Sequence, residues 1–358
     1  MKEILILSKV GITCKKYKKL KELKGKSSIL DLLIKNPSVC TELLGEDKYR
    51  KLLKELECDN IDKYIRSLDK MGMKYLVCEE PDFPVALKCM EEYPLVIYYV
   101  GDKNLLSESL ITIVGSRTPT SYGSFVAEKF TKELVQSGLV TISGLAFGID
   151  SIVAETTLKN KGKTIAFLAG GLDKIYPEEH TALARKIVKE GGLVMSTYPP
   201  YKRAQKFSFL ERNKIMSLLS KGSLIIEAGS KSGTLSTGNY TIENGRELFV
   251  VPGNINSTKS EGSNKLIEQF PETFTISAEK ICEKLKVKYK LTSKEAKETT
   301  LDEEDVLILG ACIDEEKSLD EIADITKLES KFLLRKLTMM EINGLIKKLP
   351  GNFYIGEK

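Results

Sequence analysis

The sequence predicts an α/β protein whose central domain is a Rossmann-like, doubly wound and mostly parallel sheet. Short apolar runs alternate with helical stretches between residues 76 and 286, and glycine- or serine-rich loops follow several of these runs. Apolar strands separated by helices are typical of a parallel sheet that helices cover on both faces. We expect a small helical domain before this core and a winged-helix domain after it.

Changes of pattern along the chain predict four segments. Residues 1–75 form a small helical domain of the SAM or helix-hairpin-helix kind, because leucine and isoleucine recur there at helical spacing between glycines and a proline. The core follows at 76–286, and the polar, lysine-rich segment 287–300 is expected to be a linker. Residues 301–358 form the winged-helix domain.

Within these segments the elements follow in order. Core strands are expected over 95–100, 110–114, 139–143, 164–168, 193–196, 223–227 and 247–251, with helices over 125–136, 181–189 and 235–244. The stretch around Phe209 has few strand or helix signals, so we expect it to be irregular. In the last domain, helices over 303–312, 319–325 and 329–340 precede a strand–turn–strand at 345–355, which is the winged-helix order.

Composition excludes several kinds of protein. The seven cysteines are odd in number and form no C-x-x-C pair, which disfavours a zinc ribbon, a redox motif and a disulfide framework and favours a reducing cytoplasm. The single histidine, His180, rules out a multi-histidine metal site, and no apolar run is long enough to span a membrane. We expect a cytoplasmic protein with no cofactor, no metal and no membrane association.

Charge is distributed unevenly along the chain. The net charge of +5 is made up of +6 over residues 1–70, +4 over 71–300 and −5 over 301–358. A basic front and an acidic tail suggest modules with different partners. Because nucleic-acid-binding modules are normally basic, we expect the acidic tail to contact protein rather than DNA.

Four of the five loops that follow core strands carry groups suited to an anion. Ligands of an open parallel sheet bind at the carboxyl ends of its strands, where glycine lets the backbone approach closely and helix N-termini offer N–H groups. The candidate phosphate contacts in these loops are Gly115, Ser116 and Arg117; Ser143 and Gly144; Lys174; and Ser232, Gly233 and Thr234. Neither a Walker A loop nor a G-x-G-x-x-G fingerprint occurs, so ATPase and NAD-dependent functions are not supported.

The remaining loop interleaves basic and aromatic residues. Its candidates are Lys206, Phe209, Arg212 and Asn213. This mixture suits single-stranded nucleic acid, because cations hold the backbone and aromatic faces stack on unpaired bases. We expect Phe209 to stack on a base, with a core position as the alternative, and we expect Arg117, Lys174 and Lys206 to line one basic groove.

Taken in order, these motifs resemble the DNA-processing protein A family (DprA, also called Smf) of bacterial competence proteins. The resemblance covers residues 80–280 and includes Tyr93-Pro94, Val114–Arg117, Ser143–Ala146, Gly148–Asp150, Gly171–Asp173, Tyr176-Pro177, Arg212-Asn213, Glu227-Ala228, Ser232-Gly233, Gly245–Glu247, Val251–Gly253 and Gly262–Ile267. It implies a Rossmann-like core that binds single-stranded DNA and forms a homodimer. It also implies that the protein protects incoming DNA and delivers RecA recombinase onto it during natural transformation, without catalytic turnover.

The sequence departs from the family pattern at four places. The family usually has Ala-His where this chain has Val153-Ala154, and Glu where it has Thr197. Its Phe-Pro-x-Arg-Asn-Arg run carries Leu210 and Lys214 here. These changes mark a divergent member and leave the anion-binding residue types largely intact.

Two other functions remain open at this point. A nucleotide phosphoribohydrolase of the lysine-decarboxylase-like Rossmann group is one, although its P-G-G-x-G-T-x-x-E signature is missing. A transcription regulator that uses the winged helix is the other, and the acidic tail argues against it. Gel shifts with single-stranded, duplex and ribonucleotide ligands would separate binding proteins from the hydrolase, which would instead release a free base.

Overall fold

The computed structural model describes residues 2–25, 27–56, 60–290, 302–313, 315–342, 345–349 and 351–356. Contacts within the chain group it into two compact units, residues 1–291 and 292–358. Most of the linker that we expect at 287–300, namely residues 291–300, lies outside the described part. Its first residues pack on the core instead, because Tyr289 donates a hydrogen bond to the Glu133 carboxylate at 3.1 Å.

The first unit contains an eight-stranded sheet in the order β1-β2-β6-β5-β4-β3-β7-β8. The strands are β1 (Lys74–Val77), β2 (Val96–Gly101), β3 (Leu110–Val114), β4 (Val140–Ser143), β5 (Thr164–Leu168), β6 (Leu193–Ser196), β7 (Gly222–Ile225) and β8 (Glu247–Val250). The six strands from β6 to β8 are parallel, whereas β1 and β2 are antiparallel additions at one edge. The expected mostly parallel α/β class is confirmed, and β1 is an additional strand that the sequence pattern missed.

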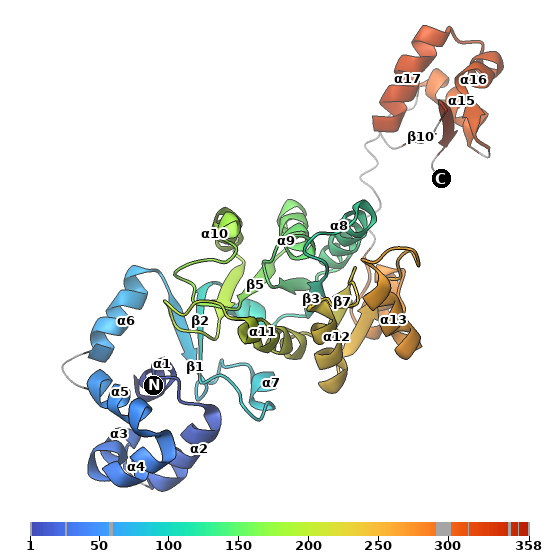
Figure 1. Cartoon of the computed structure of the whole chain (residues 1–358). Coiled ribbons are helices and arrows are strands. Elements are labelled where there is room, and N and C mark those ends of the chain that lie inside the picture. The colour runs from blue at the N-terminus through green and yellow to red at the C-terminus, as the bar shows by residue number, and fades with distance from the viewer. Residues whose placement is uncertain are drawn as a thin grey trace. The chain divides into compact units, whose positions relative to one another are not determined.

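Helices cover both faces of this sheet. Figure 1 shows α8 (Ser121–Gln136), α9 (Ile149–Lys159) and α10 (Thr181–Lys189) on one face, with α11 (Lys206–Leu219) and α12 (Thr234–Glu243) on the other. The strand order reverses beside β3, because β4 to β6 extend the sheet in one direction and β7 and β8 extend it in the other. The carboxyl ends of β3 and β7 therefore form the topological switch point, where doubly wound folds bind ligands.

One expectation about local structure is wrong. Phe209 lies in the first turn of α11, not in an irregular segment. The N-cap Gln205 explains the start of this helix, because its backbone N–H donates to the Ser208 hydroxyl at 2.8 Å. Glutamine is a poor N-cap signal in a sequence, and the basic and aromatic residues of the first turn have no clear helical periodicity.

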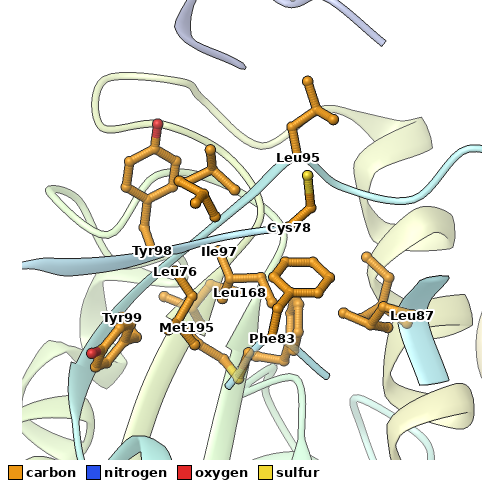
Figure 2. Close-up of a cluster of buried hydrophobic side chains, with 14 of the residues drawn as sticks. Leu76, Cys78, Phe83, Leu87, Leu95, Ile97, Tyr98, Tyr99, Leu168 and Met195 are labelled. Atoms are coloured by element: carbon orange, nitrogen blue, oxygen red, sulfur yellow. The ribbon is translucent and has the colours of Figure 1, made fainter. Parts of the chain in front are cut away.

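The N-terminal helices and the sheet share one hydrophobic core. These helices are α1 (Lys2–Lys9), α2 (Cys14–Leu23), α3 (Ile29–Lys35), α4 (Pro37–Leu44), α5 (Glu46–Leu56) and α6 (Asn60–Lys70). The core continues through the antiparallel edge of the sheet to short α7 (Val85–Lys88). Figure 2 shows Leu76, Phe83, Ile97 and Met195 on one side of β2 and Tyr98 on the other. Tyr64 of α6 also reaches Tyr98, with their hydroxyl oxygens 3.3 Å apart. This packing places the N-terminal helices against the sheet edge that β1 and β2 form.

Three further elements complete the first unit after β8. They are α13 (Glu261–Gln269), the short 3-10 helix Pro271–Thr273 and α14 (Ala278–Lys284). Two other 3-10 turns, Lys103–Ser107 and Glu178–His180, join strands to the elements that follow them. No helix in the described part of the chain is long and apolar enough to cross a membrane.

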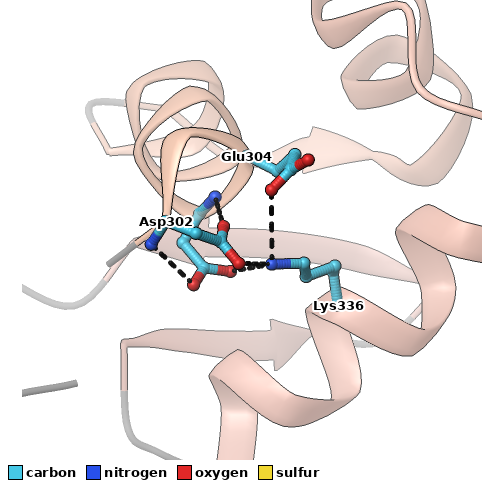
Figure 3. Close-up of polar contacts among 4 residues, drawn as sticks. Asp302, Glu304 and Lys336 are labelled. Atoms are coloured by element: carbon cyan, nitrogen blue, oxygen red, sulfur yellow. Dashed lines mark hydrogen bonds and ion pairs between the residues drawn. The ribbon is translucent and has the colours of Figure 1, made fainter. Parts of the chain in front are cut away.

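The second unit has the expected order of three helices and a hairpin. It contains α15 (Glu303–Cys312), β9 (Lys317–Ser318), α16 (Leu319–Thr326), α17 (Ser330–Ile342), β10 (Ile346–Leu349) and β11 (Phe353–Gly356). Ser318 caps α16, because its hydroxyl accepts a hydrogen bond from the Glu321 backbone N–H. Figure 3 shows that Lys336 of α17 points to the acidic start of α15, where it pairs with Asp302 and, at 3.7 Å, with Glu304.

Candidate nucleic-acid interface

Two neighbouring clefts open at the carboxyl ends of the parallel strands. The switch-point cleft, of about 490 Å³, lies where β3 and β7 end, and its lining residues include Gly115, Ser116, Arg117, Phe209, Arg212, Asn213, Ser232, Gly233, Thr234 and Lys259. The β5 cleft, of about 500 Å³, lies beyond β5, and its lining residues include Gly144, Lys174, Tyr176, Lys202, Arg203 and Phe209. Phe209 lines both clefts, so its ring forms the boundary between them.

Phe209 is half-buried and surrounded by cationic and aromatic groups. The Arg117 guanidinium carbon lies 5.4 Å from the centroid of its ring, and that of Arg212 lies 5.9 Å away. Tyr176 contacts the same ring edge-on, at 6.1 Å between centroids. Arg117 is exposed, whereas Arg212 is 5% exposed. One cation beside the ring is therefore held in place and the other is free to reorient toward a ligand.

Arg212 is held by groups within the protein. Its Nη1 donates to the Phe167 carbonyl at 2.9 Å, and its Nε donates to Asn213 Oδ1 at 2.9 Å. Burial lowers the pKa of Arg212, and the negative charge of Asp150 opposes this shift. Arginine remains protonated because its ordinary pKa is above about 12. The predicted phosphate contact at Arg212 thus lies at the wall of the switch-point cleft as a fixed, buried positive charge.

The loop after β4 binds a carboxylate from the first turn of α9. The Asp150 carboxylate accepts hydrogen bonds from the backbone N–H groups of Gly144, at 3.0 Å, and Ala146, at 3.4 Å. Burial raises the pKa of Asp150, and the positive charge of Arg212 opposes this rise. Ser143 is also engaged, because its hydroxyl donates to the Asp150 carbonyl at 3.3 Å. The candidate groups Ser143 and Gly144 therefore already have partners within the chain.

The loop after β7 closes the other side of the switch-point cleft. The Thr234 hydroxyl donates to the Gly115 carbonyl at 3.0 Å, which joins this loop to the loop after β3. The Asn213 amide donates to the Gly233 carbonyl at 3.4 Å, and the Ser232 hydroxyl accepts from the Thr234 backbone N–H at 3.2 Å. The predicted residues of three separate loops are thus brought together around one cleft.

The predicted basic groove is brought together only in part. Arg117 and Lys174 line the two adjoining clefts, and the Lys174 ammonium lies 3.2 Å from the Glu178 carboxylate. Lys206, at the exposed start of α11, lines neither cleft. The structure adds Lys259, which lies beyond β8. Lys259 follows β8, the last strand of the sheet, so the rule that ligands gather at the carboxyl ends of strands also predicts it.

Two more cations extend the β5 cleft. Lys202 and Arg203 are exposed and line it. Their sequence neighbourhood is basic, and their position is fixed by the Gly171 N–H, which donates to the Lys202 carbonyl at 2.8 Å. Over the described ranges, no group of three or more histidine, cysteine or acidic residues is placed to hold a metal ion. The edge of the sheet is a cationic surface divided by an aromatic ring.

This fold and site define a doubly wound α/β protein with a cation-lined cleft at its switch point. The comparisons with known proteins identify its family. Residues 74–286 match the model of the family called DNA recombination-mediator protein A. The chain is also 36% identical over 253 residues, 70% of its own length, to the DNA processing protein DprA of Bacillus subtilis, of which it covers 84%. The chain belongs to the DNA recombination-mediator protein A family.

Solved structures support the same assignment. DNA processing protein A from Streptococcus pneumoniae superposes with a TM-score of 0.66 at 28% identity, covering 81% of this chain and 98% of that protein. DNA processing protein A from Helicobacter pylori, whose structure was described for its single-stranded DNA binding mode, superposes with a TM-score of 0.54 at 31% identity. That match covers 61% of this chain and 98% of the Helicobacter protein.

Proposed function

We propose that this chain is a recombination mediator that binds single-stranded DNA along the carboxyl edge of its sheet. One observation carries the proposal: Phe209 divides two cation-lined clefts and lies beside both Arg117 and Arg212. An unpaired base stacks on the Phe209 ring, while the phosphates on either side contact Arg117 in one cleft and Lys174 in the other. The family membership and the DNA-binding mode described for the Helicobacter protein support this assignment.

The remaining candidate residues shape the site in different ways. Hydroxyl and backbone N–H groups that suit a phosphate line the switch-point cleft. They belong to Gly115, Ser116, Ser232, Gly233 and Thr234. Asn213 ties the loop after β7 to α11. Arg212 contributes positive charge from within the cleft wall, and Lys206 contributes charge at the outer start of α11. Ser143 and Gly144 act by positioning Asp150, which faces Arg212.

We further propose that the bound strand is handed to RecA recombinase, and that the protein protects incoming DNA in this way during natural transformation. The cations and the ring bind DNA without cutting it, so no catalytic step is assigned. A homodimer through the core is part of this proposal. Apolar side chains exposed beside the β8 edge, Phe274 and Ile276, together with Phe125 of α8, suit such a contact.

The proposal is tested by binding and by mediation. Fluorescence titrations should show that single-stranded DNA binds more tightly than duplex DNA of the same length. The full chain should also accelerate RecA assembly on single strands coated with a single-strand-binding protein, measured as the DNA-dependent ATPase activity of RecA. Equal affinity for single strands and duplex would contradict the binding mode. Release of a free base from a nucleoside monophosphate would instead favour the phosphoribohydrolase.

A further inference from the structure

We propose that the single-strand path does not end at the sheet but continues onto helix α2 of the N-terminal region, where Lys15 and Lys18 contact additional phosphates. This inference rests on the proposed binding of single-stranded DNA by the core. It assigns a role to the N-terminal helices, which take no part in either cleft at the carboxyl edge.

A third cleft joins the two regions. This N-terminal cleft, of about 550 Å³, lies between the turn that joins α1 to α2, residues 8–14, and the core residues Tyr198, Lys202 and Phe207. Lys202 also lines the β5 cleft, so the two clefts are adjacent and share a cation. A strand that leaves the β5 cleft past Lys202 therefore enters the N-terminal cleft.

A fourth cleft carries the path along α2. This α2 cleft, of about 600 Å³, is lined by Lys18, Lys21, Lys88 and Tyr93, among others. Tyr93 also lines the N-terminal cleft, so these two clefts adjoin in the same manner. Four successive clefts thus lead from the switch point to α2. Each adjoining pair shares one lining residue, namely Phe209, Lys202 and Tyr93 in turn.

The charges of α2 favour a polyanion. This helix of ten residues carries five lysines and one glutamate. Lys21 is already paired with Glu79 at 2.5 Å, and the Lys16 ammonium donates to the Leu44 carbonyl at 3.1 Å. Lys15 and Lys18 are exposed, and among the described residues neither ammonium group has a carboxylate partner within 4 Å.

Both of these lysines contact residues that line the N-terminal cleft, Lys18 through its ammonium group and Lys15 through its backbone N–H. The Lys18 ammonium lies 5.0 Å from the centroid of the Tyr93 ring, and the Lys15 backbone N–H donates to the Glu92 carboxylate at 3.5 Å; Tyr93 and Glu92 both line that cleft. The cleft's other acidic residue, Glu211, accepts a hydrogen bond from the Tyr198 hydroxyl. Both carboxylates accept hydrogen bonds from neutral donors and neither pairs with the Lys15 or Lys18 ammonium group, so these two ammonium groups can bind phosphate.

Aromatic side chains occur at intervals along the same path. Phe207 is 51% exposed at the mouth of the N-terminal cleft, and Tyr198 and Tyr93 line its walls. Base stacking on such rings does not depend on sequence, so cations interrupted by aromatic rings are the features expected of a single-strand track. A duplex, whose bases are already stacked, cannot use these rings.

The test compares ligand lengths on the full chain. We expect a Lys15→Gln/Lys18→Gln double variant to bind a short oligothymidylate of about six nucleotides, which fills the sheet-edge clefts, as tightly as the unaltered protein. We expect the same variant to bind an oligothymidylate of about 25 nucleotides about tenfold more weakly at low salt, because two phosphates no longer have a cation. The salt slope for the long ligand should fall by about 1.4, from two phosphates at about 0.7 each.

A matched control removes the same charge elsewhere. Lys63 and Lys70 are exposed on α6 and line none of the four clefts, so Lys63→Gln/Lys70→Gln should leave the affinity and salt slope of the long ligand unchanged. Equal losses in the two double variants, or no loss in either, would overturn the inference. A short ligand that fails to bind the unaltered protein would instead contradict the proposed function of the core, and melting curves would show that each variant is folded.

Discussion

The guanidinium of Arg117 lies over the ring of Phe209, 5.4 Å from its centroid. The two residues come from different elements, since Arg117 lies in the loop after β3 and Phe209 in the first turn of α11. Their contact joins the switch-point cleft to the β5 cleft. The exposed arginine also covers the ring that a base would stack on. We infer that a bound strand displaces this contact, so that the ring receives a base and the guanidinium a phosphate.

Removal of the phosphate-binding cations should change the salt dependence of binding. Each phosphate of a single strand that a protein cation neutralises adds about 0.7 to the slope of log K against log salt. We expect Arg117→Ala and Lys174→Ala each to reduce the slope by about that amount, because their side chains line the two clefts. Lys206→Ala should have a smaller effect, since Lys206 lines neither. Titrations over a salt series measure this, and unchanged slopes for both cleft variants would refute the phosphate contacts.

A methyl group at Gly144 should destabilise the protein. A Cβ atom there would lie 1.6 Å from Arg212 Nη1, and that side chain is buried and bonded to the Phe167 carbonyl. The arginine cannot move without losing its partner, so Gly144→Ala should lower the free energy of unfolding by about 1–3 kcal/mol. Urea denaturation measures the loss.

Gly233→Ala provides the control for this prediction. A Cβ atom at Gly233 meets nothing within 4 Å, and the residue already has a right-handed helical backbone conformation. Its stability should match that of the unaltered protein within about 0.5 kcal/mol. If the two alanine variants were equally stable, the close packing of Arg212 against the β4 loop would not be a constraint on the fold.

The acidic start of α15 should titrate differently when Lys336 is removed. The hydrogen bond from Lys336 is the largest cause that lowers the pKa of Asp302 from 3.8 to about 2. A carboxyl group whose pKa is lower in the folded state stabilises that state at pH values above its ordinary pKa of 3.8. This stabilisation is lost as the pH falls from 3.8 through about 2. Lys336→Met should therefore raise the pKa of Asp302 toward 3.8, which NMR titration of its carboxyl carbon measures.

Lys331→Met on the same helix is the matched variant for this titration. Lys331 is exposed and has no carboxylate partner within 4 Å among the described residues, so its removal should leave the Asp302 titration unchanged. A low pKa that persisted in the Lys336 variant would show that the backbone N–H of Asp305, the second cause, is sufficient. The ion pair also means that Lys336 is neutralised by acidic residues of its own unit.

Alternating apolar runs and glycine loops were sufficient to predict the parallel strands and the edge of the sheet at which most of the candidate residues gather. Strand register and loop order put Gly115, Thr234 and Arg117 at one edge of the sheet, and their positions follow from topology. The burial of Arg212 could not be predicted, because it depends on the depth at which α11 packs and on Asp150 in the first turn of α9. The edge strand β1 was missed because only Leu76 and Val77 of its four residues are buried, so it lacks the continuous apolar run of the other core strands.

The titration of single-stranded DNA into Phe209→Ala, beside duplex DNA of the same length, tests the central claim most directly. Stacking on an aromatic ring contributes about 1–3 kcal/mol per base, so the variant should bind single strands about tenfold more weakly. Duplex affinity and the salt slope should not change, because no charge is removed, and a melting curve should show a folded protein. A folded variant that binds single strands as tightly as the unaltered protein would contradict the claim that Phe209 receives a base.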